Sequence, residues 1–340
     1  MATAPDLASI VGDPAWLCHR YDEQTDSFHY RRVERARHRS AAFLIDADLG
    51  PEASPIVIRR RDAAPLAPLP GPLHFIFHSA FCASTMLVRA LDIEGAAMGL
   101  SEPVLLNDMV GWRRRGARPH EHAAVMADAL RQLARPWAPG EAVVLKPSNV
   151  FNGLAAGALA LSPGSRAILL AAPLPVFLAS VARKGLDCRL WVRELLEGLL
   201  QEGMVDLGFQ PSDYLRQTDL QVAAVGWLAQ QALFARILKH FGPDRIATLD
   251  SERLTGNPAA SVAAAAAFLG LGRTQPTDYA AHPALGRDSK SGIAFAPGQR
   301  QADQRAALEA YRDEIEKVAV WAEAVATAAR VPLTLPAALA

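Results

Sequence analysis

Residues 73–91, which read LHFIFHSAFCASTMLVRAL, decide the fold. The apolar run at residues 73–77 is typical of a short buried strand, and residues 86–91 have the composition of a helix. Between them lies a loop of mostly small or hydroxyl-bearing side chains, residues 78–85. A strand followed by a loop and a helix is the unit from which α/β sheets are built.

The same alternation continues along the chain. Further strands are predicted at residues 97–100, 142–145, 166–172 and 245–249. Helical patterns lie between or after them, at residues 121–135, 177–181, 191–200, 220–240 and 302–329. Because strands and helices alternate, we expect an α/β fold of three layers, with a mostly parallel central sheet flanked by helices.

The part of the chain ahead of this pattern differs in composition. A Pro-rich segment at residues 51–72 breaks regular structure and predicts a boundary. We therefore expect an N-terminal extension of unknown role at residues 1–70 and an α/β domain at residues 71–340. The basic run RRVERARHR, residues 31–39, is interpreted as a solvated face.

Composition excludes several classes of function. The 340 residues contain 35 Lys and Arg and 35 Asp and Glu, which argues against broad binding of nucleic acid or anionic membranes. The three cysteines, Cys18, Cys82 and Cys188, lack metal-ligand spacing and fit a reducing cytoplasm. Residues 1–12 lack the pattern of a signal peptide, and the longest apolar stretches are shorter than the ~20 residues of a bilayer crossing. We expect a cytoplasmic protein without metal, nucleic-acid or membrane partners.

The loop at residues 78–85 is the first candidate site. Backbone N–H groups and the positive end of the following helix dipole would point at a bound anion, and the hydroxyls of Ser84 and Thr85 would donate to it. The alternative is a tight turn in which Ser84 or Thr85 caps the helix.

Two further chemical groups follow predicted strands. Glu102 stands in SEPVLLND, residues 101–108, where it would act as a base or only as an acid favoured by a helix start. Lys146 ends an apolar strand in LKPSN, residues 145–149. It would face a bound phosphate or sulfate, since ligands bind at strand ends in open α/β sheets, or it would only be exposed to solvent.

In their order along the chain, these segments resemble the sulfotransferase family of the P-loop-containing nucleoside triphosphate hydrolase superfamily, as a divergent bacterial-type member. The family's nucleotide-binding loop reads Pro-Lys/Arg-Ser-Gly-Ser/Thr-Thr. Residues Cys82, Ala83, Ser84 and Thr85 align with its last four positions, and the resemblance implies that they hold the donor's 5′-phosphosulfate. Phe81 stands where the family has its cation.

The resemblance also implies roles for residues further along the chain. Glu102 would take the acceptor's proton, and Lys146 would face the transferred group. His78, Arg89 or Lys146 would replace the cation missing at position 81.

Ser180 matches the serine of the family's 3′-phosphate motif, or is only a structural helix serine. Ala172 stands at the arginine position of that motif, so Arg183 or Lys184 would supply the charge. In the late loop GRDSKSG, residues 286–292, Arg287 and Lys290 would cover the nucleotide, or the loop is plain solvent-exposed chain.

The resulting hypothesis is transfer of a sulfuryl group from 3′-phosphoadenosine 5′-phosphosulfate (PAPS) to a hydroxyl or amine of a small-molecule or peptide acceptor, without a metal. We expect acceptor contacts from Trp191, Trp227 and Phe234. Two alternatives remain: a repurposed P-loop protein that binds a nucleotide or phosphorylated ligand, and a structural partner protein. A kinase is disfavoured because the loop lacks Gly-Lys-Ser/Thr.

Overall fold

The computed structural model describes residues 6–50, 55–272, 278–288, 294 and 298–339. Five parallel strands form the central sheet in the order β5-β6-β4-β7-β8. Their bounds are β4 Leu73–His78, β5 Ala97–Ser101, β6 Ala142–Lys146, β7 Ala167–Ala171 and β8 Ile246–Asp250. The predicted α/β fold with a parallel sheet is confirmed.

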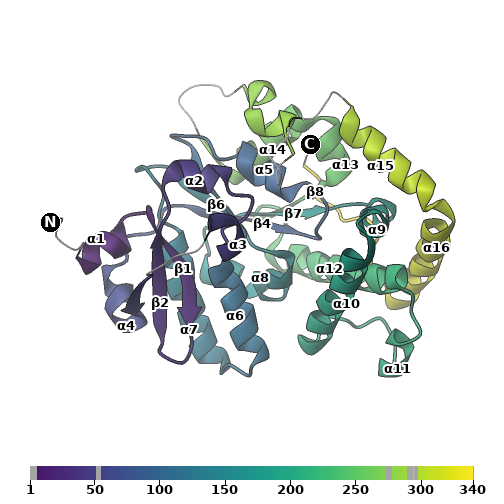
Figure 1. Ribbon diagram of the computed structural model, residues 1–340, viewed down its shortest axis with the longest axis horizontal. Helices are drawn as coiled ribbons and strands as arrows, with labels where there is room; N and C mark the ends of the chain where they lie inside the picture. Colours follow the sequence, from purple (N-terminus) through teal and green to yellow (C-terminus); the bar gives the residue numbers. More distant parts are fainter. Residues whose placement is uncertain (1–5, 51–54, 273–277, 289–293, 295–297, 340) are drawn as a thin grey trace.

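Helices cover both faces of this sheet (Figure 1). One face packs against α5 Ser84–Ala90, α9 Leu174–Arg183 and α14 Pro258–Leu269. The other packs against α6 Val104–Arg114, α7 Pro119–Leu133 and α8 Ala155–Leu161. Strand side chains alternate between the two cores, so Ile76 belongs to the first core, while Phe75 and Phe77 belong to the second.

The remaining elements extend these layers. They are η2 Asn149–Leu154, α10 Gly185–Gln201, α11 Pro211–Tyr214, α12 Asp219–Phe241, α13 Ser251–Gly256, η3 Tyr279–Ala281, η4 Pro283–Gly286, α15 Gln299–Ala310 and α16 Arg312–Ala329. A continuous helix was expected at residues 302–329, and this is wrong at Tyr311. The backbone leaves the helical region there (φ −117°, ψ 21°), and the ring packs on the first core.

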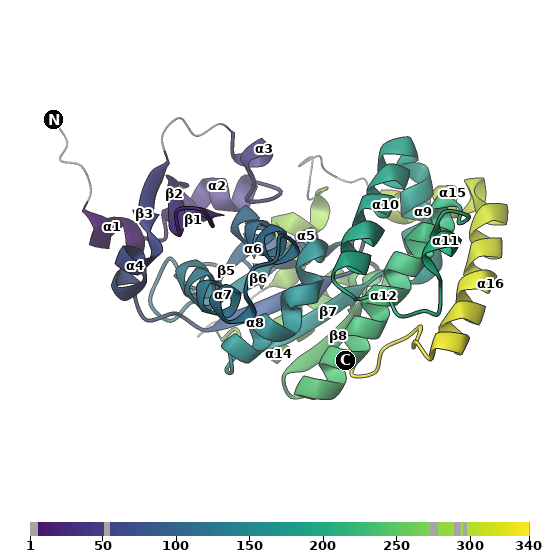
Figure 2. The same ribbon diagram turned by 90° about the horizontal axis from the view of Figure 1, so that it is seen from below.

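The N-terminal segment forms a second, antiparallel sheet of β1 Trp16–Asp22, β2 Ser27–Arg32 and β3 Ile56–Arg59. Short helices flank it: α1 Leu7–Gly12, α2 Arg35–Ser40, α3 Asp46–Leu49, α4 Arg60–Ala63 and η1 Ala64–Leu66. This sheet lies at one end of the long axis, and α15 and α16 lie at the other (Figure 2). Phe28 and Tyr30 share one apolar core with Phe75 and Leu105, so the segment packs directly on the α/β part.

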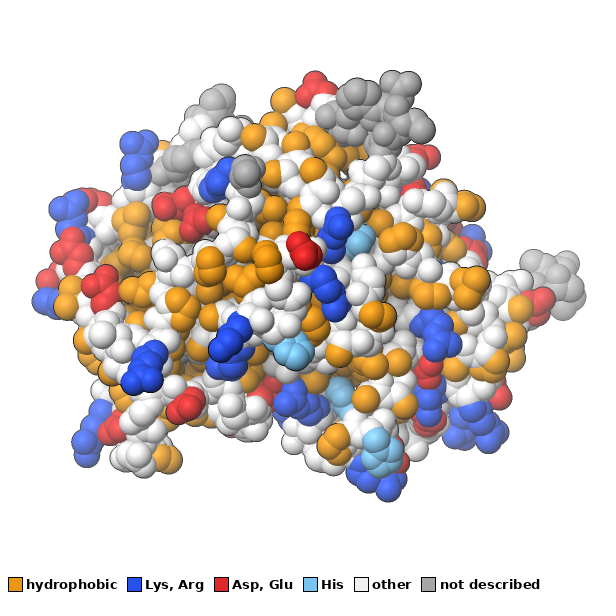
Figure 3. Space-filling view, turned by 180° about the vertical axis from the view of Figure 1, so that it is seen from behind, with side chains coloured by type: hydrophobic (Ala, Val, Ile, Leu, Met, Phe, Trp, Pro, Cys, Tyr) orange, Lys and Arg blue, Asp and Glu red, His pale blue; other side chains and the backbone are white. Residues whose placement is uncertain are grey.

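The basic run at residues 31–39 is not a solvated face throughout, and that interpretation was wrong for two residues. Arg31 is only 5% exposed because its guanidinium donates to the carbonyls of Leu49 and Gly50. His38 is buried, and its ring stands edge-on to Trp137 with centroids 5.4 Å apart. On the face seen in Figure 3, basic and acidic side chains are interspersed among apolar ones. Of the described helices, none is long and apolar enough to span a membrane.

His38 makes the stability of the fold depend on pH. Among the described residues, neither ring nitrogen has a hydrogen-bond partner, and burial lowers the pKa of His38 to about 4, with a smaller contribution from Arg135. The unfolded chain takes up this proton near pH 6.5, so the free energy of unfolding should fall as the pH drops from 6.5 toward 4. The slope from this group is at most about 1.4 kcal/mol per pH unit.

The variant His38→Phe should keep the contact with Trp137, flatten this slope and leave stability near pH 8 almost unchanged. Urea unfolding at a series of pH values measures it, and His120→Phe, at an exposed position on α7, is the control. A pH profile identical to that of the native protein would rule out His38 as the group responsible.

Candidate functional site

The side chains with chemistry meet where three neighbouring strands end. The loop at residues 79–83 follows β4, Glu102 follows β5, and Lys146 is the last residue of β6. In parallel sheets the carboxyl ends of the strands share one edge, and ligands bind there.

Lys146 and Glu102 form a buried ion pair at this edge. The Lys146 ammonium donates to the Glu102 carboxylate and lies 3.4 Å from Thr85 Oγ1. Lys146 is 1% exposed, whereas the Glu102 side chain is 18% exposed. A buried ammonium stays charged only with a partner of this kind, so Glu102 keeps a cation at the end of the sheet. Lys146 is therefore not the solvent-exposed lysine of the alternative interpretation.

The loop after β4 has a strained backbone. Ala80 (φ 72°), Phe81 (φ 52°) and Ala83 (φ 64°) are all left-handed, as is Glu102 (φ 48°). Each such non-glycine residue costs roughly 1 kcal/mol or more, and such strain gathers at ligand-binding and catalytic sites. Left-handed residues next to right-handed ones turn neighbouring N–H groups toward one point, which is the geometry of anion-binding loops.

His78 joins the loop to the ion pair. Its Nδ1 accepts the Ala80 N–H at 3.1 Å, so the ring proton lies on Nε2. Nε2 donates to the Pro147 carbonyl at 3.0 Å and lies 3.7 Å from Glu102 Oε1. The His78 carbonyl accepts from Asn152 at 3.0 Å. One buried imidazole thus fixes the loop, the end of β6 and the carboxylate relative to one another.

Phe81 occupies the position where the sequence comparison expects a cation. Its ring packs against Phe177 and Trp191, with centroid distances of 5.7 and 5.6 Å. The Lys184 ammonium, from the end of α9, lies 5.5 Å from the centroid of the Phe81 ring. A cation therefore stands next to the loop, but it comes from a different segment.

Of the three aromatic residues expected to contact an acceptor, Trp191 lies beside the loop. The expectation is wrong for Trp227 and Phe234, which are buried in the core. Trp227 Nε1 donates to the Ala172 carbonyl at 2.9 Å, so its polar atom serves the fold.

The loop's hydroxyl and thiol groups lie in the first turn of α5 or just before it. The N-cap of α5 is Ala83, so neither Ser84 nor Thr85 caps this helix, and both are buried. Cys82 is also buried, and burial raises the pKa of its thiol. Ser180 Oγ donates to the Val176 carbonyl at 2.9 Å, within its own helix.

Arg287, the described basic residue of the expected late loop, lies elsewhere. Arg287 is exposed and lines a separate pocket together with Arg89, while Lys290 lies outside the described residues. Arg89 donates to the carbonyls of Ser40 and Ala41.

Sequence reasoning missed Phe43, whose ring centroid lies 5.0 Å from Lys146 Nζ. Phe43 belongs to the segment interpreted as an extension, and no local pattern connects it to β6. Asn152 was also missed, because an asparagine in a short helical turn carries no signal of its contact with the His78 carbonyl.

No protein-family model matches the chain, and no curated protein matches it. Solved structures resemble it, among them the following three. The sulfotransferase domain of the Synechococcus PCC 7002 olefin synthase is 17% identical, with a TM-score of 0.42, over 80% of this chain and 91% of that one. The sulfotransferase domain from the curacin biosynthetic pathway is 14% identical, with a TM-score of 0.39, over 75% and 98%. A sulfotransferase from Alicyclobacillus acidocaldarius is 19% identical, with a TM-score of 0.40, over 70% and 94%.

The ion pair predicts an asymmetry in stability. Glu102→Gln removes the carboxylate that pairs with the buried Lys146 ammonium, which should cost about 2–4 kcal/mol. Lys146→Met should cost under about 1 kcal/mol, because the partly exposed carboxylate regains water and the methionine packs on Phe43. Urea unfolding of the two variants at pH 7 measures both values. If Lys146→Met lowers the free energy of unfolding more than Glu102→Gln does, then Lys146 does not depend on Glu102 for its burial, and this account of the pair is wrong.

Proposed function

We propose that this chain transfers a sulfuryl group from PAPS to the hydroxyl or amine of an acceptor molecule. The observation that carries the proposal is the buried Lys146–Glu102 pair beside a left-handed loop at the end of β4. It sets a cation and a carboxylate on one side of a loop suited to an anion. Transfer between two oxygens needs both, a cation for the leaving oxygen and a base for the attacking one.

In the proposed reaction the acceptor oxygen attacks the sulfur of PAPS. The new O–S bond forms while the bond from sulfur to the bridging oxygen breaks, and that oxygen keeps the electron pair. The products are the sulfated acceptor and 3′,5′-adenosine bisphosphate. The acceptor's proton passes to the Glu102 carboxylate, which is 18% exposed and thus open to an incoming molecule.

Lys146 supports this step through its three N–H donors. One donor holds Glu102 and another lies toward Thr85. The positive charge of the ammonium would stabilise the bridging oxygen as negative charge develops on it. His78 acts as a positioning residue, because its Nε2–H holds the Pro147 carbonyl 3.7 Å from Glu102 while its Nδ1 holds the loop backbone.

The loop provides more groups for the donor's 5′-phosphosulfate than α9 provides for its 3′-phosphate. The backbone at Cys82, Ala83, Ser84 and Thr85 would hold the 5′-phosphosulfate. Near α9 the cation is Lys184, whereas Ser180 already donates its hydroxyl proton to the Val176 carbonyl and has none left for a phosphate. Because Arg287 lines the pocket beside β5, the proposal leaves it out of this donor site.

Binding without transfer is the second candidate function, and Phe81 and Ala172 favour it, since both stand where the resemblance expects cations. Isothermal titration with 3′,5′-adenosine bisphosphate, AMP and ATP separates nucleotide selectivity from catalysis. Selective binding of the bisphosphate supports the PAPS proposal, and preference for AMP or ATP supports the second candidate.

The role of Lys184 is tested in the same titration. Lys184→Gln should weaken bisphosphate binding about fivefold, because an exposed cation near a phosphate contributes about 1 kcal/mol. Its binding of AMP, which lacks the 3′-phosphate, should change little. Lys239→Gln, at an exposed position on α12, is the matched control. Equal bisphosphate affinity of the Lys184 variant and the native protein would remove Lys184 from the donor site.

Glu102 is tested by turnover. Glu102→Gln should abolish release of 3′,5′-adenosine bisphosphate from PAPS in the presence of hydroxyl and amine acceptors, while bisphosphate binding stays within about twofold. The amide cannot accept the proton but keeps the shape of the side chain. Unchanged turnover in this variant is the result that would exclude Glu102 as the base.

A further inference from the structure

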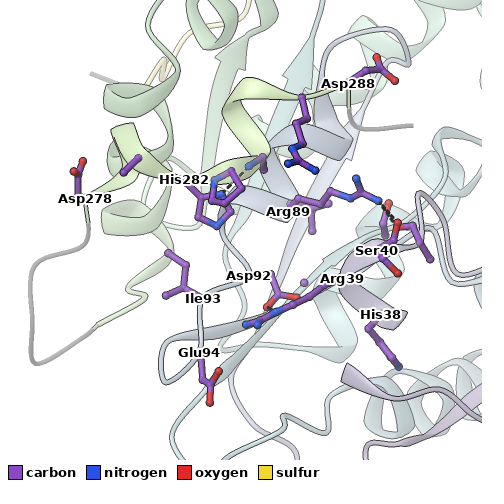
Figure 4. Close-up of a pocket in the computed structure, with 18 residues that line it drawn as sticks. His38, Arg39, Ser40, Arg89, Asp92, Ile93, Glu94, Asp278, His282 and Asp288 are labelled. Atoms are coloured by element: carbon purple, nitrogen blue, oxygen red, sulfur yellow. Dashed lines mark hydrogen bonds and ion pairs between the residues drawn. The ribbon is translucent and has the colours of Figure 1, made fainter. Parts of the chain in front are cut away.

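A pocket of about 730 Å³ lies beside the edge strand β5, between α5, α2 and residues 278–288 (Figure 4). Its volume is in the range of small-molecule sites. The lining combines the apolar side chains of Val88, Ile93 and Pro283 with several charged ones. None of the donor-loop residues 79–85 lines it.

The pocket adjoins the proposed transfer site through Ser101. Ser101 lines the pocket and stands opposite Lys146 in the β5–β6 register, so the two side chains lie on the same face of the sheet. Glu102 is the next residue in the chain. Ser101 is 7% exposed, and its hydroxyl has no hydrogen-bond partner among the described residues. A ligand group that reaches this hydroxyl therefore comes next to Lys146 and Glu102.

Arg89 gives the pocket a cation that forms no ion pair with a described residue. Its Nη2 donates to the carbonyls of Ser40 and Ala41, at 2.8 and 2.7 Å, while its Nε is buried and has no partner among the described residues. Within the same part of the chain, Arg89 forms no ion pair. Burial lowers the pKa of Arg89, and Asp288 opposes this at longer range. A partly desolvated guanidinium of this kind gains stability from an anionic ligand.

Among the described residues, no acidic side chain of the lining forms an ion pair with Arg89, and Asp288 acts on it only at longer range. Asp92 is already paired with Arg39 at 3.0 Å. Glu94 and Asp278 are exposed, and Figure 4 shows them away from Arg89. His282 Nδ1 accepts the Ala284 N–H at 3.2 Å, so its ring proton is on Nε2 and is available for donation.

We propose that this pocket binds an organic anion, a molecule with an apolar body whose negatively charged group is held by Arg89. Its identification as the acceptor rests on the proposed function: the molecule's hydroxyl would lie at Ser101, within reach of Glu102. The apolar body would lie against Val88, Ile93 and Pro283. The acceptor class is thus a hydroxylated organic anion.

The test uses a matched pair of fluorescent probes, the anion 8-anilinonaphthalene-1-sulfonate and its uncharged analogue N-phenyl-1-naphthylamine, titrated into the full-length protein. The native protein should bind one anionic probe per chain. Arg89→Leu should weaken binding of the anion about tenfold and leave binding of the neutral probe nearly unchanged. Arg236→Leu, at an exposed position on α12 outside the pocket, should change neither.

A second variant covers the case in which Arg89→Leu loosens the fold, since Arg89 also holds the carbonyls of Ser40 and Ala41. Ala281 lines the pocket and is exposed, so Ala281→Trp fills the cavity without removing a hydrogen bond of a buried side chain. It should weaken both probes while the melting temperature stays constant. Unchanged affinity for the anion in both variants would overturn the proposal.

Adding saturating 3′,5′-adenosine bisphosphate to the probe complex tells whether the pocket is the acceptor site or part of the donor site. If the pocket is the acceptor site, the bisphosphate leaves the bound probe in place. Competitive displacement assigns the pocket to the donor and overturns the acceptor identification. The probe titrations do not depend on donor binding or turnover, so they test the pocket by itself. A failure of the proposed function would show separately, as no binding of the bisphosphate.

Discussion

A lysine buried at the end of a strand can stay charged only if a carboxylate comes to it, and much of the structure follows from this constraint. Glu102 meets the requirement by adopting a left-handed backbone directly after β5, with its N–H on the Lys146 carbonyl at 2.7 Å. His78 and Phe43 then enclose the pair from β4 and from the N-terminal segment. The ends of three strands and one loop of the N-terminal segment therefore meet at one ammonium group.

The central sheet could be predicted from the sequence because its strands are buried on both faces and read as short apolar runs, such as residues 73–77. The relation of the N-terminal segment to this sheet could not be predicted. The Pro-rich segment at 51–72 indicates a boundary, but Phe28 and Tyr30 pack into the same core as Phe75. Local composition can predict where a chain turns, but it cannot predict which apolar faces pack together in the folded protein.

The candidate site also has a part that the sequence predicts and a part that it does not. Glu102, Lys146 and Thr85 were found because strand ends in a parallel sheet meet at one edge, a rule that sequence order alone can apply. The position of Lys184 over the Phe81 ring depends on how α9 packs, so the sequence offered it only as one of two replacement cations. Arg287 shows the converse, since its place in a basic loop suggested the donor site and the structure puts it on the pocket of Arg89.

Alanine and phenylalanine at the left-handed positions of the loop have a consequence for ligand binding. Glycine-rich loops sample many backbone states and lose that freedom when a ligand arrives. Ala80, Phe81 and Ala83 have far fewer states open to them, and His78 and the α5 helix hold them in place. The loop therefore loses its conformational entropy during folding, and the anion of the proposed function would bind a backbone that is already ordered.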